Sequence, residues 1–213
     1  MLEKVLAGFA ASSPLEVLAL VLGVTYSLLA VRRNRYCWIA GAGSSLLLAW
    51  LAASRQLPMQ ALLQIYYVLM SVYGFWHWSR QAGTAPIKIG YWPLRWHLGS
   101  AVILAVLAWL TATYLAAETD AAWPRLDSAV TWFSLYATLL VARARIENWL
   151  YWIVTDTVLV FLYASQGLYF AALLFLLYIV IAWSGLVTWT WHYHREASVA
   201  WFRRPCYVMS QIV

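Results

Sequence analysis

The chain has 213 residues, of which 64% are hydrophobic and only 10% carry a charged side chain. A water-soluble domain of this composition would have too little polar surface to face water. Several apolar runs approach the roughly 20 residues that a helix needs to cross the hydrocarbon core, and the alternating strands of a barrel are not visible. We therefore expect an all-α integral membrane protein. The net charge of +6 does not indicate a nucleic-acid partner, because the basic residues gather at the ends of apolar runs.

Apolar runs in chain order predict seven spans, and each break between them has a local cause. Arginines follow the first run, Pro58 suits an early position in the third helix, and Gly167 suits a helix end. The first run follows acidic residues and precedes basic ones, the reverse of a signal peptide, so we expect no cleavable signal. The predicted spans are 15–31, 38–54, 57–79, 98–117, 128–143, 148–165 and 168–192.

The distribution of lysine and arginine predicts the orientation. One side of the membrane receives Lys4, Arg55 and Arg125. The other side has the larger number of lysines and arginines. Because cytoplasmic loops carry the excess of basic residues, this side is expected to be the cytoplasmic one. The N-terminus is therefore expected outside and the C-terminus in the cytoplasm. The cytoplasmic set is Arg32, Arg33, Arg35, Arg80, Lys88, Arg95, Arg143, Arg145, Arg195, Arg203 and Arg204.

An internal repeat is visible when residues 28–78 are shifted by 111 positions onto 139–189. Because apolar matches are common among membrane helices, the inference depends on the polar, aromatic and glycine matches. With one span between the copies, the pattern predicts two parallel three-helix repeats joined by a linker helix, a 3+1+3 architecture typical of transporters. We divide the chain into 1–80, 81–125 (loop and linker span), 126–193 and the cytoplasmic tail 194–213. The matches are Arg32 with Arg143, Trp38 with Trp149, Tyr67 with Tyr178, Gly74 with Gly185, and Trp78 with Trp189.

The sixth span contains a polar and aromatic patch, ENWLYWIVTD, at residues 147–156. Four residues, Trp149, Trp152, Asp156 and Tyr163, fall within an arc of roughly 80° on a helix, with Asn148 at its edge. A carboxylate inside a membrane costs about 2.5–3.5 kcal/mol on insertion scales, so Asp156 is expected to face protein or water. The tryptophans on its face are then expected to point inward as well.

The third span has a companion stripe that includes Gln64 and Tyr67, and its repeat partner in the seventh span includes Tyr178. Aromatic planes beside one acid and several amides suit a flat, polar and cationic ligand. The histidines are isolated or on different helical faces, and no nucleophile–base pair is evident, so we predict no metal site, no cofactor and no enzyme activity. Cys37 and Cys206 lack metal-ligand spacing and are expected to be free thiols.

The sixth and seventh spans resemble the PnuC family of bacterial nicotinamide riboside transporters. The resemblance rests on the N-W-x-x-W-x-x-x-D pattern, the GLY turn at 167–169 and the closing G-x-x-x-W, and the 3+1+3 repeat extends it over most of the chain. The residues of the two spaced motifs are Asn148, Trp149, Trp152, Asp156, Gly185 and Trp189.

This resemblance implies a seven-helix fold related to the SWEET sugar transporters and a homotrimer in the bacterial inner membrane. It also implies facilitated diffusion of nicotinamide riboside, with the substrate trapped by a cytoplasmic kinase and without a coupled ion. Trp149 and Trp152 would flank the pyridinium ring. The carboxamide and hydroxyls would be held by Asn148, Asp156 and Gln64, and the site would be completed by Tyr67, Tyr178 and Trp183.

Two alternatives remain open at this point. Thiamine is also a flat cation and riboflavin is a flat ring with a polyol, so a transporter of either vitamin with the same fold fits the aromatic stripe. A membrane-embedded structural subunit without transport would instead bury the polar stripes in helix contacts and leave no ligand pocket. The apolar and basic tail is expected to be able to lie on the cytoplasmic membrane surface.

Overall fold

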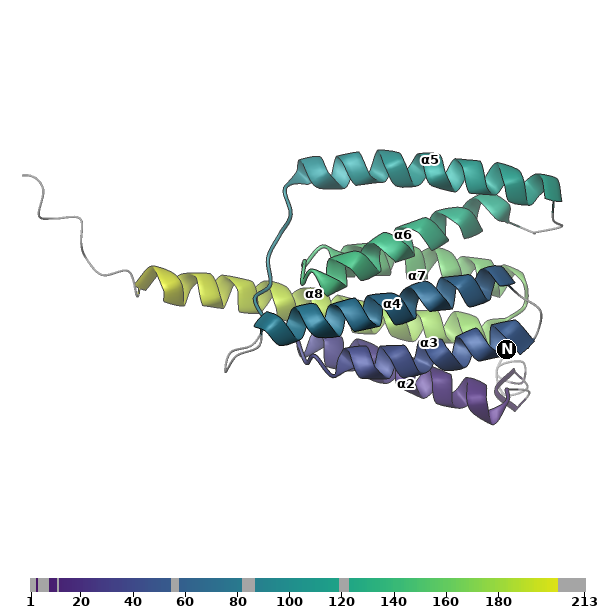
Figure 1. The fold of residues 1–213 in the computed structure, drawn as a ribbon, viewed down its shortest axis with the longest axis horizontal. Coiled ribbons are helices and arrows are strands. Elements are labelled where there is room, and N and C mark those ends of the chain that lie inside the picture. Colours follow the sequence, from purple (N-terminus) through teal and green to yellow (C-terminus); the bar gives the residue numbers. More distant parts are fainter. Residues whose placement is uncertain are drawn as a thin grey trace, which may run out of the picture.

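The computed structural model describes residues 3, 8–10, 12–54, 58–81, 87–118 and 123–202, and these are almost entirely helical. Figure 1 shows the helices running lengthwise side by side, with α8 extending past the others at one end. The described helices are α2 (Pro14–Val31), α3 (Cys37–Ser54), α4 (Pro58–Gln81), α5 (Leu94–Glu118), α6 (Pro124–Ala142), α7 (Asn148–Ser165) and α8 (Tyr169–Phe202).

The helix bounds lie close to the predicted spans except at three ends. Helices α5 and α6 each begin about one turn early, and at α6 this is because Pro124 occupies the first helical position. Helix α8 continues to Phe202 instead of ending at 192, so the predicted tail begins as a continuation of the last helix. Cys37 is a buried free thiol, whereas Cys206 lies outside the described residues.

Four of the described helices are long and apolar enough to cross a membrane by composition alone: α2, α3, α5 and most of α8. The other three predicted spans correspond to α4, α6 and α7. These three helices carry more polar and aromatic side chains, which lowers their hydropathy, and they supply much of the polar lining described below.

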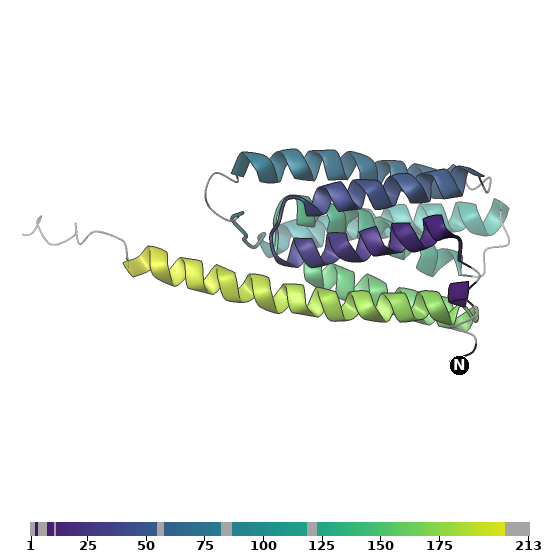
Figure 2. The same cartoon turned by 90° about the horizontal axis from the view of Figure 1, so that it is seen from below.

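Helix packing divides the bundle into two groups of three. Helix α3 packs against α2 and α4, and α7 packs against α6 and α8. The groups contact each other where α2 meets α8 and where α4 meets α6. Helix α5 packs mainly on α6 and lies at the edge of the bundle (Figure 1). Figure 2 again shows α8 extending past the other helices.

The turns after α2 and after α6 have the same backbone shape. Arg33 and Ala144 both adopt the left-handed region, with φ of 55° and 53°, which is uncommon for residues other than glycine. Each donates its backbone N–H to the carbonyl three residues earlier at 2.9 Å, on Ala30 and Val141 respectively. Both pairs of residues are related by the shift of 111 positions.

Two tryptophans connect the groups through equivalent hydrogen bonds. The Trp78 indole on α4 donates to the Ala142 carbonyl at the end of α6, at 3.1 Å. The Trp189 indole on α8 donates to the Val31 carbonyl at the end of α2, at 3.0 Å. The two donors are 111 positions apart, and so are the two acceptors. Each group therefore donates one hydrogen bond to the other. Both indole side chains are fully buried.

A second pair of tryptophans lies directly on glycines. The Trp38 ring covers Gly74 on α4, and the Trp149 ring covers Gly185 on α8. A Cβ atom on either glycine would lie under 3.0 Å from the ring carbons. Because Trp38 and Trp149 are almost completely buried, the rings have little room to move away. The absence of a side chain at both glycines therefore allows α3 to approach α4 and α7 to approach α8.

Replacing Gly74 or Gly185 by alanine is expected to destabilise the protein by about 1–3 kcal/mol each, as overpacking of a buried contact does. The measurement is the thermal unfolding midpoint of purified protein in detergent. Gly99→Ala on α5 is the matched control, because nothing lies within 4 Å of a Cβ at that position. Equal midpoints for all three variants would show that the rings accommodate a methyl group.

Candidate functional site

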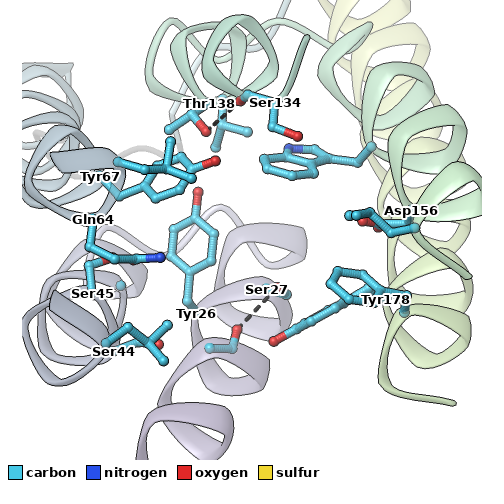
Figure 3. Close-up of a pocket in the computed structure, with 18 of the residues that line it drawn as sticks. Tyr26, Ser27, Ser44, Ser45, Gln64, Tyr67, Ser134, Thr138, Asp156 and Tyr178 are labelled. Carbon is cyan, nitrogen blue, oxygen red and sulfur yellow. Dashed lines mark hydrogen bonds between the residues drawn. The ribbon is translucent and has the colours of Figure 1, made fainter. Parts of the chain in front are cut away.

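A cavity of about 370 Å³ lies between the two groups of helices. Its lining comes from α2, α3 and α4 on one side and from α6, α7 and α8 on the other, and no described residue of α5 contributes. The volume falls within the range of small-molecule sites. Figure 3 shows hydroxyl, amide and carboxylate groups pointing toward the same space from opposite walls.

One end of the cavity is closed by a layer of four tryptophans. Trp38 and Trp149 line the cavity, and Trp78 and Trp189 lie behind them. The Trp38 and Trp78 rings meet edge to face at 5.5 Å between centroids, and the Trp149 and Trp189 rings do the same at 5.3 Å. This end lies where α2 and α6 finish and α3 and α7 begin, the side predicted to be cytoplasmic.

Beyond the tryptophans, the segment 87–92, which we call the strap, crosses both groups of helices. The Arg33 guanidinium donates to the Ile87 carbonyl at 3.2 Å. Gly90 exchanges two backbone hydrogen bonds with the α6–α7 turn, donating to Ala144 at 3.2 Å and accepting from Ile146 at 3.0 Å. The strap is therefore fixed to the turns of both groups, and it covers the tryptophan layer.

Asp156 on α7 is the acid in the middle of the cavity wall. Its side chain is buried within the protein but faces the cavity. Tyr67 and Tyr178 line the same cavity as Asp156 and come from opposite groups (Figure 3). In the described part of the chain, the carboxylate has no ion pair, and no lysine, arginine or histidine lines the cavity. Asp156 is thus left without a basic partner among the described residues of the protein.

Six of the eight residues predicted for a site line this cavity, and two do not. Asn148 is fully buried outside the cavity, and its Nδ2 donates to the Arg145 carbonyl at 2.6 Å, which ties α7 to the preceding turn. Trp183 is 61% exposed, because it lies five residues after Tyr178 and so about 140° round the helix from it. The six that line the cavity are Gln64, Tyr67, Trp149, Trp152, Asp156 and Tyr178.

Sequence reasoning missed the hydroxyl groups contributed by α2, α3 and α6. Serine and threonine are too common in helices to be singled out by composition. The repeat could have identified some of them, because Ser45 is the counterpart of Asp156 and Ser27 is the counterpart of Thr138 at the shift of 111 positions. The hydroxyl-bearing lining residues missed in this way include Tyr26, Ser27, Ser44, Ser45, Ser134 and Thr138, and the acid Asp127 was missed as well.

The cavity suits a ligand with a flat cationic ring and several hydroxyl groups. Aromatic faces and one carboxylate attract a positively charged ring, whereas hydroxyl and amide side chains pair with hydroxyls. Among the described residues there is no group of three or more histidine, cysteine, aspartate or glutamate side chains that could hold a metal ion. The arrangement therefore favours recognition of an organic cation.

Comparison with known proteins places these features in a family. The family model described as "Nicotinamide mononucleotide transporter" matches residues 13–191. The nicotinamide riboside transporters PnuC of Escherichia coli (strain K12) and of Shigella flexneri are each 29% identical over 161 residues, which is 63% of this chain and 67% of theirs.

A solved structure, the crystal structure of the vitamin B3 transporter PnuC, has the same fold. It superposes with a TM-score of 0.69 at 21% identity and covers 91% of this chain and 90% of its own. The fold likeness agrees with a family match that spans nearly the whole bundle. The chain belongs to the nicotinamide mononucleotide transporter family and is a multi-pass membrane transporter, not an enzyme.

Proposed function

We propose that this protein carries nicotinamide riboside across the bacterial inner membrane. The observation that carries the proposal is Asp156, a carboxylate without a basic partner that faces the cavity between Tyr67 and Tyr178. Nicotinamide riboside combines a pyridinium ring with a ribose. Its ring supplies the positive partner that the described lining does not give Asp156, and its ribose supplies hydroxyls that can pair with the polar wall. The names of the PnuC relatives support the same substrate.

The lining favours the riboside over the mononucleotide that appears in the family description. A mononucleotide adds a phosphate, which proteins bind with arginine, lysine or helix N-termini. The described lining contains two acids, Asp127 and Asp156, and no basic side chain. A phosphate would meet repulsion from both carboxylates without a compensating cation. The pyridinium ring alone has the charge that this cavity attracts.

We assign the ligand groups to walls according to their chemistry. Trp149 and Trp152 present indole surfaces beside Asp156 on α7, where a flat cation is stabilised. Gln64 and Tyr67 lie on the opposite wall, on α4, and pair with the ribose hydroxyls (Figure 3). Asn148 takes no part in direct binding in this assignment, and it acts on the site by fixing the start of α7.

Alternating access would come from two parallel three-helix units, within 1–80 and 126–193, that move against each other around the cavity. Equivalent contacts at positions 111 apart support a 3+1+3 duplication, with α5 as the linker. The tryptophan layer and the strap close the end that the arginine distribution puts in the cytoplasm. Inward opening would part the Trp78 and Trp189 bonds.

We further propose that diffusion is uncoupled, that a cytoplasmic kinase traps the riboside, and that the protein forms a homotrimer. Each of these proposals rests on the family resemblance.

Asp156→Asn is expected to weaken binding of nicotinamide riboside about 10- to 150-fold, because it removes a charged partner worth about 1.5–3 kcal/mol. The measurement is the dissociation constant of the radiolabelled riboside for purified protein in nanodiscs. Ser45→Ala, at the counterpart position, should change affinity less than threefold. The neutral dihydropyridine form of the riboside should bind wild type and Asp156→Asn alike. Unchanged affinity of Asp156→Asn for the cation would remove the basis of the proposal.

Competition should separate the candidate substrates. Unlabelled nicotinamide riboside is expected to displace the labelled riboside, whereas nicotinamide mononucleotide should require at least about 100-fold more ligand, because its phosphate meets two carboxylates and no cation. Thiamine and riboflavin serve as further competitors in the same titration. A mononucleotide or thiamine that competes better than the riboside would reassign the substrate.

A further inference from the structure

A second acid lies at the other end of the cavity, far from the tryptophan layer. Asp127 is in the first turn of α6, is solvent-exposed, and still lines the cavity. Tyr163 and Phe175 line the same end, and their rings stack nearly parallel, with 5.3 Å between centroids and 9° between planes. Asp127 lies at the start of α6, Tyr163 near the end of α7 and Phe175 near the start of α8, so all three belong to the same end of the bundle. An acid and a stacked aromatic pair thus border the mouth.

The Asp127 side chain makes no specific contact with the described residues that would hold the fold, although an acid in a first helical turn is favoured by the helix dipole. The N-cap of α6 is Trp123, and no side chain caps this helix. In the ranges that the structure describes, no hydrogen bond or ion pair engages the Asp127 side chain. A carboxylate that stabilised the fold through specific contacts would be expected to have a partner. This carboxylate instead faces the cavity mouth.

The position 111 residues earlier provides an internal comparison. Glu16 lies in the first turn of α2, where its carboxylate accepts from the Ser13 backbone N–H at 2.7 Å. Ser13 in turn accepts from the Glu16 backbone N–H, which completes a capping box. The corresponding acids of the two groups therefore differ in use: Glu16 caps its own helix and does not line the cavity, whereas Asp127 lines the cavity and caps nothing.

We propose that Asp127 and the Tyr163–Phe175 ring pair form an entry subsite that takes the cationic ring of the ligand before it reaches Asp156. This inference rests on the proposed function, because it assumes that an aromatic cation enters the cavity.

The two acids are too far apart to hold the same charged ring at once. Tyr163 lies seven residues after Asp156 on α7, and a helix rises about 1.5 Å per residue, so the subsite is about 10 Å from Asp156 along the axis. Opposite charges attract at this range, and a cleft of one sign raises the association rate of a charged ligand. A group that acts only on entry raises the rates of association and dissociation together and leaves the final affinity nearly unchanged.

The test measures association of nicotinamide riboside with purified protein in nanodiscs by stopped-flow tryptophan fluorescence at low ionic strength. Asp127→Asn should lower the association rate constant about two- to tenfold, with less than a twofold change in the dissociation constant. The difference should disappear as salt is raised, because salt screens exposed charges. The neutral dihydropyridine riboside should associate with wild type and Asp127→Asn at the same rate.

Glu16→Gln is the matched control, because glutamine also completes a capping box and the variant removes one charge from the same end of the bundle. It should bind at the wild-type rate. The entry subsite is refuted if Asp127→Asn associates as fast as wild type, if Glu16→Gln is slowed equally, or if the neutral ligand is slowed as much as the cation. Failure of wild type to bind the riboside would instead refute the proposed function, and this inference with it.

Discussion

The structure depends on two buried indole N–H groups that each reach across to the opposite group of helices. Trp78 donates to Ala142, and Trp189 donates to Val31. The acceptors are carbonyls near helix ends, where backbone oxygens lack a partner within the helix. A buried polar group left unpaired costs about 1–3 kcal/mol, so these two bonds hold the groups together at the end where the cavity is closed. The Trp38 and Trp149 rings fill the space between these two hydrogen bonds and the cavity.

This arrangement gives the cavity two different ends. At one end, aromatic rings, the strap and the two helix turns form a continuous buried layer. At the other, lining residues such as Asp127 are exposed to solvent. Parting the closed end would expose both indole donors and both carbonyls, and water entering a channel can pair with all four groups. The same bonds that close the cavity can therefore be exchanged for water at little net cost, which a transporter requires and a purely structural subunit does not.

The sequence predicted much of the fold because the membrane restricts what a chain can do. Apolar runs separated by arginine, proline and glycine located most helix ends, and the cost of a buried charge correctly indicated that Asp156 faces inward. Trp183 lies outside the cavity because its helical angle turns it away from Tyr178, although an indole suits both an interior wall and the lipid interface. Asn148 belongs to the same motif as Trp149 and Trp152, but as the first residue of α7 it bonds the preceding turn and does not line the cavity. The hydroxyls of α2 and α3 were not recognised because their helices read as uniformly apolar.

Packing contacts recur at positions 111 apart, but the side chains of the cavity wall do not. Tyr67 and Tyr178 are counterparts at the shift of 111 positions. By contrast, the counterpart of Asp156 is Ser45, and the counterpart of Trp152 is Gly41. In the proposed alternating access, equivalent packing would let the two groups move as similar bodies, because the contacts that join them are alike on each side. Recognition needs the opposite property, since a ligand with a charged ring at one end and a sugar at the other has no twofold symmetry. The indoles and the acid lie on α7, and an amide lies opposite them on α4. They provide that difference without altering the packing within each group.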